Sequence, residues 1–316
     1  MNKLNNKLQF FCAVFGACLM ACLMACSGAK KNAELLPESK HYLWKVSDEN
    51  SSVWLLGSIH LADSTLYPLA PVIDSAFAHA EELAVEINMN DDEVVKEVGE
   101  QSAAQGVLAE GMLRDVLPED MWRTVDSLCA AWNVPIAMLE KMRPWLVAMT
   151  LSSYAFVHAG LNPDYGIDYV LLDRAATEGK AIVGLETAEE QIDAIAGKTE
   201  SDSAGIYYLR TTLREIAGVD SIVTNLMRAW KTGDDEMLHS LLDNDDDDLL
   251  SQDSKFKDEY EQRIYVNRNA KMAESIAKFL SENRKVFVVV GVAHLALEKD
   301  NVIDALRKRG LKVERF

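Results

Sequence analysis

The sequence predicts an α/β fold with some α+β character, in which a mixed central sheet of largely parallel strands is built from both ends of the chain. Three observations predict it. Apolar segments of strand length occur near both ends and finish on glycine. Each is followed by a segment with helical spacing and then by another strand-like segment. Long helical stretches separate the two ends.

The first strands follow the N-terminal segment. Residues 42–46 and 53–56 are typical of two strands of a hairpin, because apolar and aromatic residues flank a turn-rich stretch. The second strand ends on Gly57. Residues 71–82 have helical spacing and lead into a third apolar segment, residues 83–87. The order strand, helix, strand predicts a right-handed parallel unit.

The middle of the chain is mainly helical. Helical spacing is expected over about residues 91–160 and again over about 188–281, and the second stretch is strongly acidic. Between them, residues 181–185 form an apolar strand segment that is expected at the centre of the sheet and ends at Glu186. We therefore predict one domain, residues 41–316, with a helical cap made by the two insertions.

The C-terminal stretch repeats the first unit. An apolar strand over residues 285–290 is followed by a helix over about 301–309 and a strand over 311–314. Because the two units lie at opposite ends of the sequence, the predicted sheet brings the two ends of the chain together.

The N-terminus has the features of a bacterial lipoprotein signal. Two lysines precede an apolar run over residues 8–25, and a small residue stands directly before Cys26 at the end of this run. The pattern looks like a lipobox, which predicts a signal peptide over residues 1–25, lipid on Cys26 and a tether over residues 26–40. Cys22 is an alternative lipidation site, and an uncleaved membrane helix is an alternative interpretation of the run.

Lipidation predicts a membrane partner and a location in the cell envelope, at the outer membrane or the periplasmic face. The formal charge is −18 over 316 residues, and a field of this sign repels phosphate backbones, which argues against nucleic-acid binding. With Cys26 lipidated, Cys129 is the one cysteine left in the body of the protein, where it suits a small buried apolar position. A disulfide framework is therefore ruled out.

The acidic run over residues 243–248 suggests, at first, a calcium-binding loop. An EF-hand loop beginning at Asp243 would need glycine at its sixth position and glutamate at its twelfth, where this chain has Asp248 and Ser254. A solvated acidic loop is the better interpretation. Recruitment of a partner by the acidic helical cap is a further hypothesis.

Two of the six histidines have the same sequence setting. His60 and His294 each stand three residues after a glycine, Gly57 or Gly291, that terminates an apolar strand. The carboxyl ends of strands are where ligands bind in open α/β sheets, and glycine lets the backbone approach a ligand closely. If the two strands are neighbours, the imidazoles converge. The alternative for either histidine alone is a hydrogen-bonded structural residue.

Converging imidazoles and carboxylates predict a divalent metal site. Two neutral imidazoles with carboxylates suit zinc, manganese or a similar ion, and such an ion turns water into a nucleophile at neutral pH. Glu86, near the end of strand 83–87, is best placed for direct contact with the ion, and Glu186 is next. Arg143 and Arg268 are candidates to stabilise an oxyanion or orient a carboxylate, with a surface or helix-capping role as the alternative.

A set of short motifs runs through the whole predicted domain. The segments are Gly57-Ser58-Ile59-His60, Tyr67-Pro68-Leu69, Ala84-Val85-Glu86, Arg143-Pro144-Trp145, Gly166-Ile167-Asp168, Gly184-Leu185-Glu186-Thr187, Arg268-Asn269 and Val290-Gly291-Val292-Ala293-His294-Leu295. In this order, from about residue 42 to residue 316, they resemble the TraB/GumN family, which is related to the Tiki proteases. The combination is far more specific than any one motif.

The resemblance implies a metal-dependent, hydrolase-like fold in which the paired Gly-x-x-His motifs and a glutamate form the active site. In the animal Tiki relatives the activity is that of a metalloprotease that uses manganese or cobalt. Carried over to this chain, the resemblance implies that His60 and His294 are metal ligands and that Glu86 is a ligand or base. The supporting motif residues are Glu186, Asp168, Arg143 and Arg268.

We therefore predict a metal-dependent hydrolase of the bacterial cell envelope, with peptidase activity as its narrower form and a peptide or small molecule as substrate. The expected ion is manganese, cobalt or zinc. The chain has no Gly-rich phosphate loop, no Gly-x-Ser-x-Gly turn and no His-Glu-x-x-His motif, which argues against nucleotide, serine-hydrolase and zincin functions. The alternative is a non-catalytic lipoprotein that binds a haem, a metal or a peptide ligand.

Overall fold

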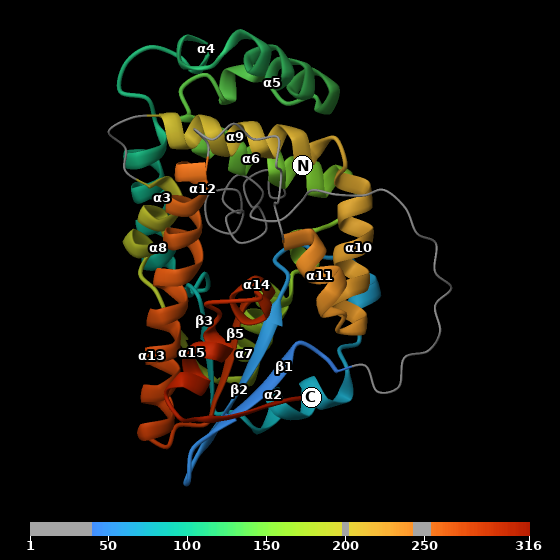
Figure 1. The fold of residues 1–316 in the computed structure, drawn as a ribbon, viewed down its shortest axis with the longest axis vertical. Helices are drawn as coiled ribbons and strands as arrows, with labels where there is room; N and C mark the ends of the chain where they lie inside the picture. Colours follow the sequence, from blue (N-terminus) through green and yellow to red (C-terminus); the bar gives the residue numbers. More distant parts are fainter. Residues whose placement is uncertain (1–39, 198–201, 243–253) are drawn as a thin grey trace.

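A six-stranded mixed sheet lies at the centre of the fold, with strand order β4-β3-β5-β2-β1-β6 (Figure 1). The computed structural model describes residues 40–197, 202–242 and 254–316. The predicted signal peptide, Cys26 and the acidic run 243–248 lie outside these residues. The strands are β1 (Leu43–Ser47), β2 (Ser52–Ser58), β3 (Glu82–Val85), β4 (Ala181–Gly184), β5 (Val286–Gly291) and β6 (Lys312–Arg315).

The strand directions confirm the predicted α/β sheet of largely parallel strands. β2 and β3 each pair in parallel with β5, and β4 pairs in parallel with β3. β1 pairs antiparallel with β2 on one side and with β6 on the other. Because β5 comes from the C-terminal end and lies between two N-terminal strands, the sheet is built from both ends of the chain.

The position of β4 differs from the prediction. This strand was expected at the centre of the sheet, but among the described strands it lies at the edge and pairs with β3 alone. The reason is that β5 occupies the place between β2 and β3, so β4 can add only to the outer side of β3. Burial agrees with this order, since every residue of β5 is buried whereas β4 is half-buried or exposed.

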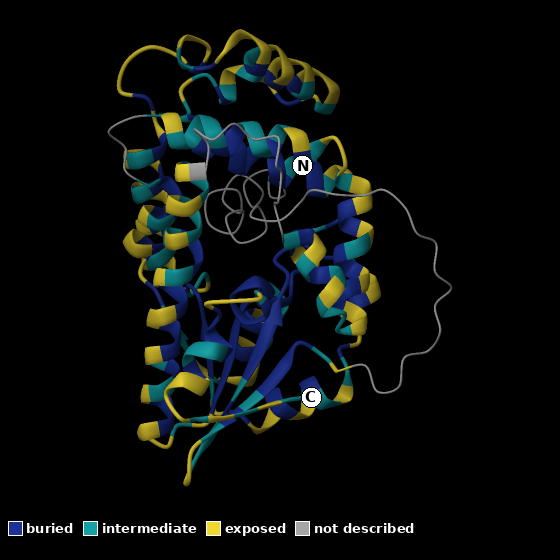
Figure 2. Ribbon diagram, in the orientation of Figure 1, coloured by how far each residue is buried: buried dark blue, intermediate teal, exposed yellow. Residues whose placement is uncertain are grey.

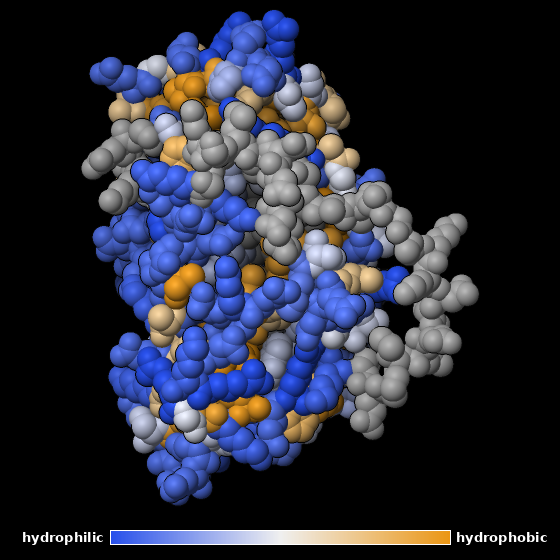
Figure 3. Space-filling view, in the orientation of Figure 1, coloured by the Kyte–Doolittle hydropathy of each residue, from blue (hydrophilic) through white to orange (hydrophobic). Residues whose placement is uncertain are grey.

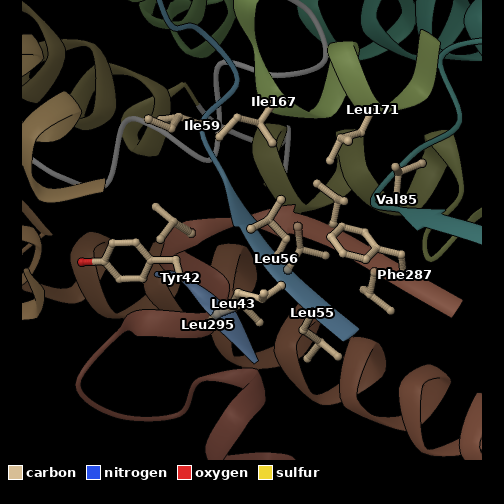
Figure 4. Packing of buried hydrophobic residues seen from close by; sticks show 14 of the residues in the cluster. Tyr42, Leu43, Leu55, Leu56, Ile59, Val85, Ile167, Leu171, Phe287 and Leu295 are labelled. Atoms are coloured by element: carbon tan, nitrogen blue, oxygen red, sulfur yellow. The ribbon is translucent and has the colours of Figure 1, made fainter. Parts of the chain in front are cut away.

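Helices cover both faces of the sheet. Figure 4 shows Leu55 and Leu56 of β2 pointing to opposite sides, with Ile167 and Leu171 on the Leu56 side. On the α2 and α7 side, Phe77 packs edge-on against Phe287 of β5, with ring centroids 5.5 Å apart. The covering helices are α2 (Pro71–His79), α7 (Ile167–Glu178), α13 (Asn267–Ser281), α14 (Val292–Ala296) and α15 (Val302–Lys308).

Most of the remaining helices form a second, helical part with its own apolar core, whereas the buried apolar residues of α3, α10 and α11 belong to the core around the sheet. Helices of the two predicted insertions pack together there, as α6 lies along α9 and α3 along α8 (Figure 1). The helices are α3 (Asp92–Gly106), α4 (Leu113–Val116), α5 (Glu119–Trp132), α6 (Pro144–His158), α8 (Ala188–Ala196), α9 (Ser203–Ile216), α10 (Val219–Thr232), α11 (Asp235–Leu242) and α12 (Ser254–Glu261). Cys129 of α5 is buried in this core, as expected for a small apolar side chain.

Helix α6 is buried on almost all of its faces, which explains why its sequence is apolar all round. Across the described ranges, the search for a helix with the length and apolar character of a membrane span finds none. The face drawn in Figure 3 is largely hydrophilic. Strand β5 and helix α14, by contrast, are buried along their whole length (Figure 2).

Candidate active site

The two histidine motifs meet at one edge of the sheet. β2 and β5 are parallel neighbours, and Ser58 at the end of β2 lies opposite Gly291 at the end of β5. The expectation that the two strands are adjacent is therefore confirmed. His60 and His294 follow these paired positions and are both buried, with 1% and 0% of their surface exposed. In Figure 1 the arrowhead of β2 points toward α14, so this carboxyl edge faces the helical part.

The two motifs differ in backbone structure. His60 lies in a bend after β2, as the sequence suggested, but His294 lies in the short helix α14 instead of a turn. Gly57 permits the close contact between the motifs, because a Cβ there would lie 2.9 Å from the Cγ2 of Val292 and 3.0 Å from its Cα. Any larger residue at this position would push α14 away from β2.

Glu86 lies directly after β3, between the histidine motifs and Arg268. Its Oε1 accepts a 2.7 Å hydrogen bond from the backbone N–H of Gly291, and its Oε2 accepts one of 2.7 Å from Nη2 of Arg268. The same Oε1 lies 3.9 Å from Nε2 of His294. Only 2% of Glu86 is exposed, so this carboxylate is held entirely by protein donors and neighbours.

Glu186 follows β4 and joins the same group. Its backbone N–H donates to the carbonyl of Glu86 at 3.0 Å. Its carboxylate accepts two hydrogen bonds from Arg268, 2.8 Å from Nε and 2.6 Å from Nη2. This two-pronged pairing is the geometry that guanidinium and carboxylate groups favour, and it makes Arg268 a bridge between two buried glutamates.

Asp168 is bonded to the first histidine. One carboxylate oxygen accepts from the Ser58 hydroxyl at 2.7 Å, and the other lies 2.7 Å from Nδ1 of His60. The backbone makes this approach possible, since a Cβ on Gly166 would lie 2.1 Å from the carbonyl oxygen of His60. The N–H of Ile167 also donates to the carbonyl of Ile59 at 3.0 Å, so the start of α7 is fixed against the His60 bend.

Arg143 lies in the helical part of the molecule. It is the residue before the first turn of α6, and it forms an ion pair of 3.0 Å with Asp202 at the start of α9. The structure therefore brings six of the predicted polar residues to the sheet edge and gives Arg143 a contact between two helices. The six are His60, Glu86, Asp168, Glu186, Arg268 and His294.

Three further residues contribute to the site but were not predicted from the sequence, although each lies within one of the short motifs. Asn269 has its Oδ1 2.6 Å from Nδ1 of His294 and is 1% exposed. Ser58 bonds to Asp168, and Gly166 allows the start of α7 to reach His60. Adjacent residues on a helix normally point in different directions, so the sequence gives no signal that both Arg268 and Asn269 reach one site. A π-helical turn over Gln262–Val266 ends two residues before Arg268, and such turns are frequent at functional sites.

Buried charge is unevenly balanced at this edge. Three carboxylates, from Glu86, Asp168 and Glu186, stand against the single guanidinium of Arg268 among these six side chains. Burial tends to raise the pKa of Glu86, but Arg268, then the two imidazoles and the N–H of Gly291, outweigh burial and hold this pKa well below its usual range.

The neighbouring imidazole responds in the same direction. Burial, followed by the charge of Arg268, lowers the pKa of His294 to about 4 against the opposing influence of Glu86 and Glu186. His294 is consequently neutral at neutral pH, the form in which an imidazole binds metal ions. With His294 neutral, the three carboxylates outnumber the positive charges among these six side chains.

The chemistry of these donors fits a divalent cation. Each imidazole has its Nδ1 bonded to an oxygen, which is the usual arrangement of metal-binding histidines. An ion of charge two would also balance the excess negative charge, which is otherwise costly to bury. Within residues 40–197, 202–242 and 254–316, however, no three His, Cys, Asp or Glu side chains are already gathered closely enough to hold a metal ion. His60, His294 and Glu86 are the residues that would hold it.

Comparisons with known proteins give relatives in bacteria. The chain is 26% identical over 156 residues to "Uncharacterized protein YbaP" of Escherichia coli (strain K12), which is 48% of this chain and 56% of that protein. The protein of the same name from Shigella flexneri matches to the same extent. The match therefore spans a little over half the length of these two relatives.

A longer match is found with an uncharacterized protein of Treponema pallidum (strain Nichols), 21% identical over 280 residues, or 88% of this chain and 83% of that protein. No solved structure matches the chain. The model of the TraB/PrgY/gumN family matches residues 42–315, which include every strand, both histidine motifs and the helical part. The chain belongs to the TraB/PrgY/gumN family.

Proposed function

We propose that this protein is a metal-dependent hydrolase of the bacterial cell envelope, with a divalent ion held by His60 and His294 beside Glu86. The observation that carries the proposal is the pair of buried imidazoles from adjacent strand ends, each bonded through Nδ1 to an oxygen. The three buried carboxylates beside one guanidinium support a cation rather than an anion as the ligand.

A divalent ion in such a site supplies polarisation of a carbonyl and activation of water at neutral pH. The side chains divide the other tasks. Glu86 suits a ligand better than a general base, because a carboxylate with a strongly lowered pKa accepts a proton weakly. Glu186 has both oxygens on Arg268, so its task is to orient the guanidinium. The positive charge of Arg268 is available to stabilise negative charge that develops on a substrate.

The substrate class in this proposal is a peptide or another small molecule with a hydrolysable carbonyl bond. The proposed location follows from the lipobox-like N-terminus, with lipid on Cys26 holding the domain at the membrane. Peptidase activity is the narrower form of the proposal.

The test is metal content. The full chain and the double variant His60→Ala, His294→Ala are dialysed against manganese, cobalt and zinc in turn, and bound metal is measured by mass spectrometry. We expect about one ion or more per wild-type chain and a large loss in the double variant. His79→Ala is the matched control, because His79 is exposed on α2 and its Nδ1 contacts the carbonyl of Ser75.

A wild-type chain without stoichiometric metal would rule out the proposal. Digestion of a peptide library by the metal-loaded chain, followed by mass spectrometry, then tests catalysis. Stoichiometric metal without cleavage of peptides or of a panel of esters and amides would favour a lipoprotein that captures its ligand without turning it over.

A further inference from the structure

Both histidines of the candidate site are bonded to a buried side chain that is not itself a predicted metal ligand. Nδ1 of His60 lies 2.7 Å from Oδ2 of Asp168, and Nδ1 of His294 lies 2.6 Å from Oδ1 of Asn269. Asp168 is 4% exposed and Asn269 is 1% exposed, so water competes little with either contact. The identity of each acceptor decides where the imidazole proton resides.

The orientation of the Asn269 amide is settled by a third residue. Its Nδ2 donates to the backbone carbonyl of Asp300 at 2.8 Å, and a carbonyl can only accept. The amide oxygen therefore faces His294, and Nδ1 of that ring must be the donor. A reversed amide would set two acceptors against each other at Asp300.

The orientation of the Asp168 carboxylate is settled in a similar way, because each of its oxygens has a partner. Its Oδ1 accepts from Ser58 at 2.7 Å, so Oδ2 is directed to His60. Asp168 is in the first turn of α7, where the helix dipole favours a negative charge. A carboxylate without a proton can only accept, so Nδ1 of His60 carries the hydrogen.

We propose that Asp168 and Asn269 are positioning residues that lock His60 and His294 in the same neutral tautomer, with the hydrogen on Nδ1 and the lone pair on Nε2. The consequence for ligand binding rests on the proposed function, because Nε2 is then the nitrogen that each ring offers to a divalent ion. Free histidine in water favours the opposite tautomer, so the protein must impose this one on both rings.

The two positioning residues are chemically unequal. Asp168 brings a full negative charge to its ring, whereas Asn269 brings a neutral amide. A carboxylate partner raises the basicity of a metal-bound imidazole, so loss of Asp168 is expected to weaken metal binding more than loss of Asn269. Of the two histidines, His60 is thus expected to donate its lone pair more strongly to a metal ion, and His294 less strongly.

The first measurement is the tautomer itself, read from imidazole nitrogen-15 chemical shifts of the full chain without metal at about pH 8, above the usual range of histidine pKa values. We expect His60 and His294 to show a protonated Nδ1 and an unprotonated Nε2. His239 is an internal control, because its Nε2 lies 2.5 Å from the carbonyl of Ala296 and must carry the hydrogen there. A spectrum in which either His60 or His294 resembles His239 would overturn the inference, and this outcome needs no variant to fold.

The second measurement is manganese affinity by calorimetry in three variants. Asp168→Asn is expected to admit the other tautomer at His60 and to weaken binding roughly 10- to 100-fold. Asn269→Leu is expected to do the same at His294 with a smaller loss, and Asn269→Asp, which restores an acceptor, should recover the tautomer. Unchanged affinity together with unchanged tautomers in Asp168→Asn would overturn the inference while leaving a metal-binding function intact. Correct tautomers in a chain that binds no metal would overturn the proposed function alone.

Discussion

Glu86 at the sheet edge and Glu215 in the helical part are both buried, with 2% and 6% of their surface exposed, yet their environments are opposite. Glu86 is bonded by Arg268 and by the N–H of Gly291, and its pKa lies well below the usual range. Oε1 of Glu215 has no hydrogen-bond partner within the part of the chain that the structure describes, and burial raises its pKa well above the usual range. Burial therefore does not decide the charge of a carboxyl group; its partners do.

Two glycines give the same contrast in packing. A Cβ on Gly166, beside the site, would lie 2.1 Å from the carbonyl oxygen of His60, whereas a Cβ on Gly99 in α3 would meet nothing within 4 Å. At the sheet edge, groups from distant segments of the chain are in direct contact, so a larger side chain there would lower the stability of the fold. Position 99 in α3, by contrast, has space for a larger side chain.

The largest expected effect on stability is that of Arg268→Gln. This change would leave Glu86 and Glu186 buried without a cation, in an environment like that of Glu215. Removing one partner of a buried ion pair costs about 3–5 kcal/mol in the free energy of unfolding. Urea denaturation measures this loss. Lys285→Gln is the control, because Lys285 and its partner Glu81 are exposed, and an exposed pair contributes less than about 1 kcal/mol. Equal losses in the two variants would contradict the role assigned to Arg268.

An intermediate effect is expected from the glycines. Gly166→Ala should cost roughly 1–3 kcal/mol, because the new Cβ forces the start of α7 away from the His60 bend. Gly99→Ala should instead stabilise the protein by about 0.5–1 kcal/mol, since alanine favours a helix interior. Thermal or urea unfolding of both variants checks the pair. If Gly166→Ala were as stable as the wild type, the close contact between α7 and the His60 bend would be wrong.

The smallest expected effect on stability concerns Glu215, and this effect is the one that depends on pH. Because its pKa is raised in the folded state, the folded chain keeps a proton above about pH 4.5 that the unfolded chain releases, and stability falls as the pH rises. Glu215→Gln removes this proton linkage. The variant should gain about 1 kcal/mol at neutral pH and less at acidic pH, where the wild-type group is protonated in both states.

Urea midpoints measured across the pH range check this difference for Glu215→Gln. A gain that stayed constant with pH would show that the carboxyl group of Glu215 is not held protonated by burial.

Much of the sheet and part of the site follow from local sequence patterns. Apolar segments ending on glycine predicted β2 and β5, and the repeated Gly-x-x-His spacing identified His60 and His294 without any structure. The backbone of the second motif was not predicted, because five residues are too few for helical periodicity to identify α14. The edge position of β4 was missed for a different reason, since strand order depends on which strands pair across the sheet.

What the sequence determined by itself is the set of chemical groups and the ends of the strands that present them. Hydrophobic periodicity and glycine act over a few neighbouring residues, so they can be seen in the chain. Tertiary structure decided how the groups are partnered. Glu86 and Arg268 are 182 positions apart, and His60 and Asp168 are 108 apart. Such pairs exist only after the sheet and its helices pack, because hydrogen bonds and ion pairs depend on distances that local sequence does not set.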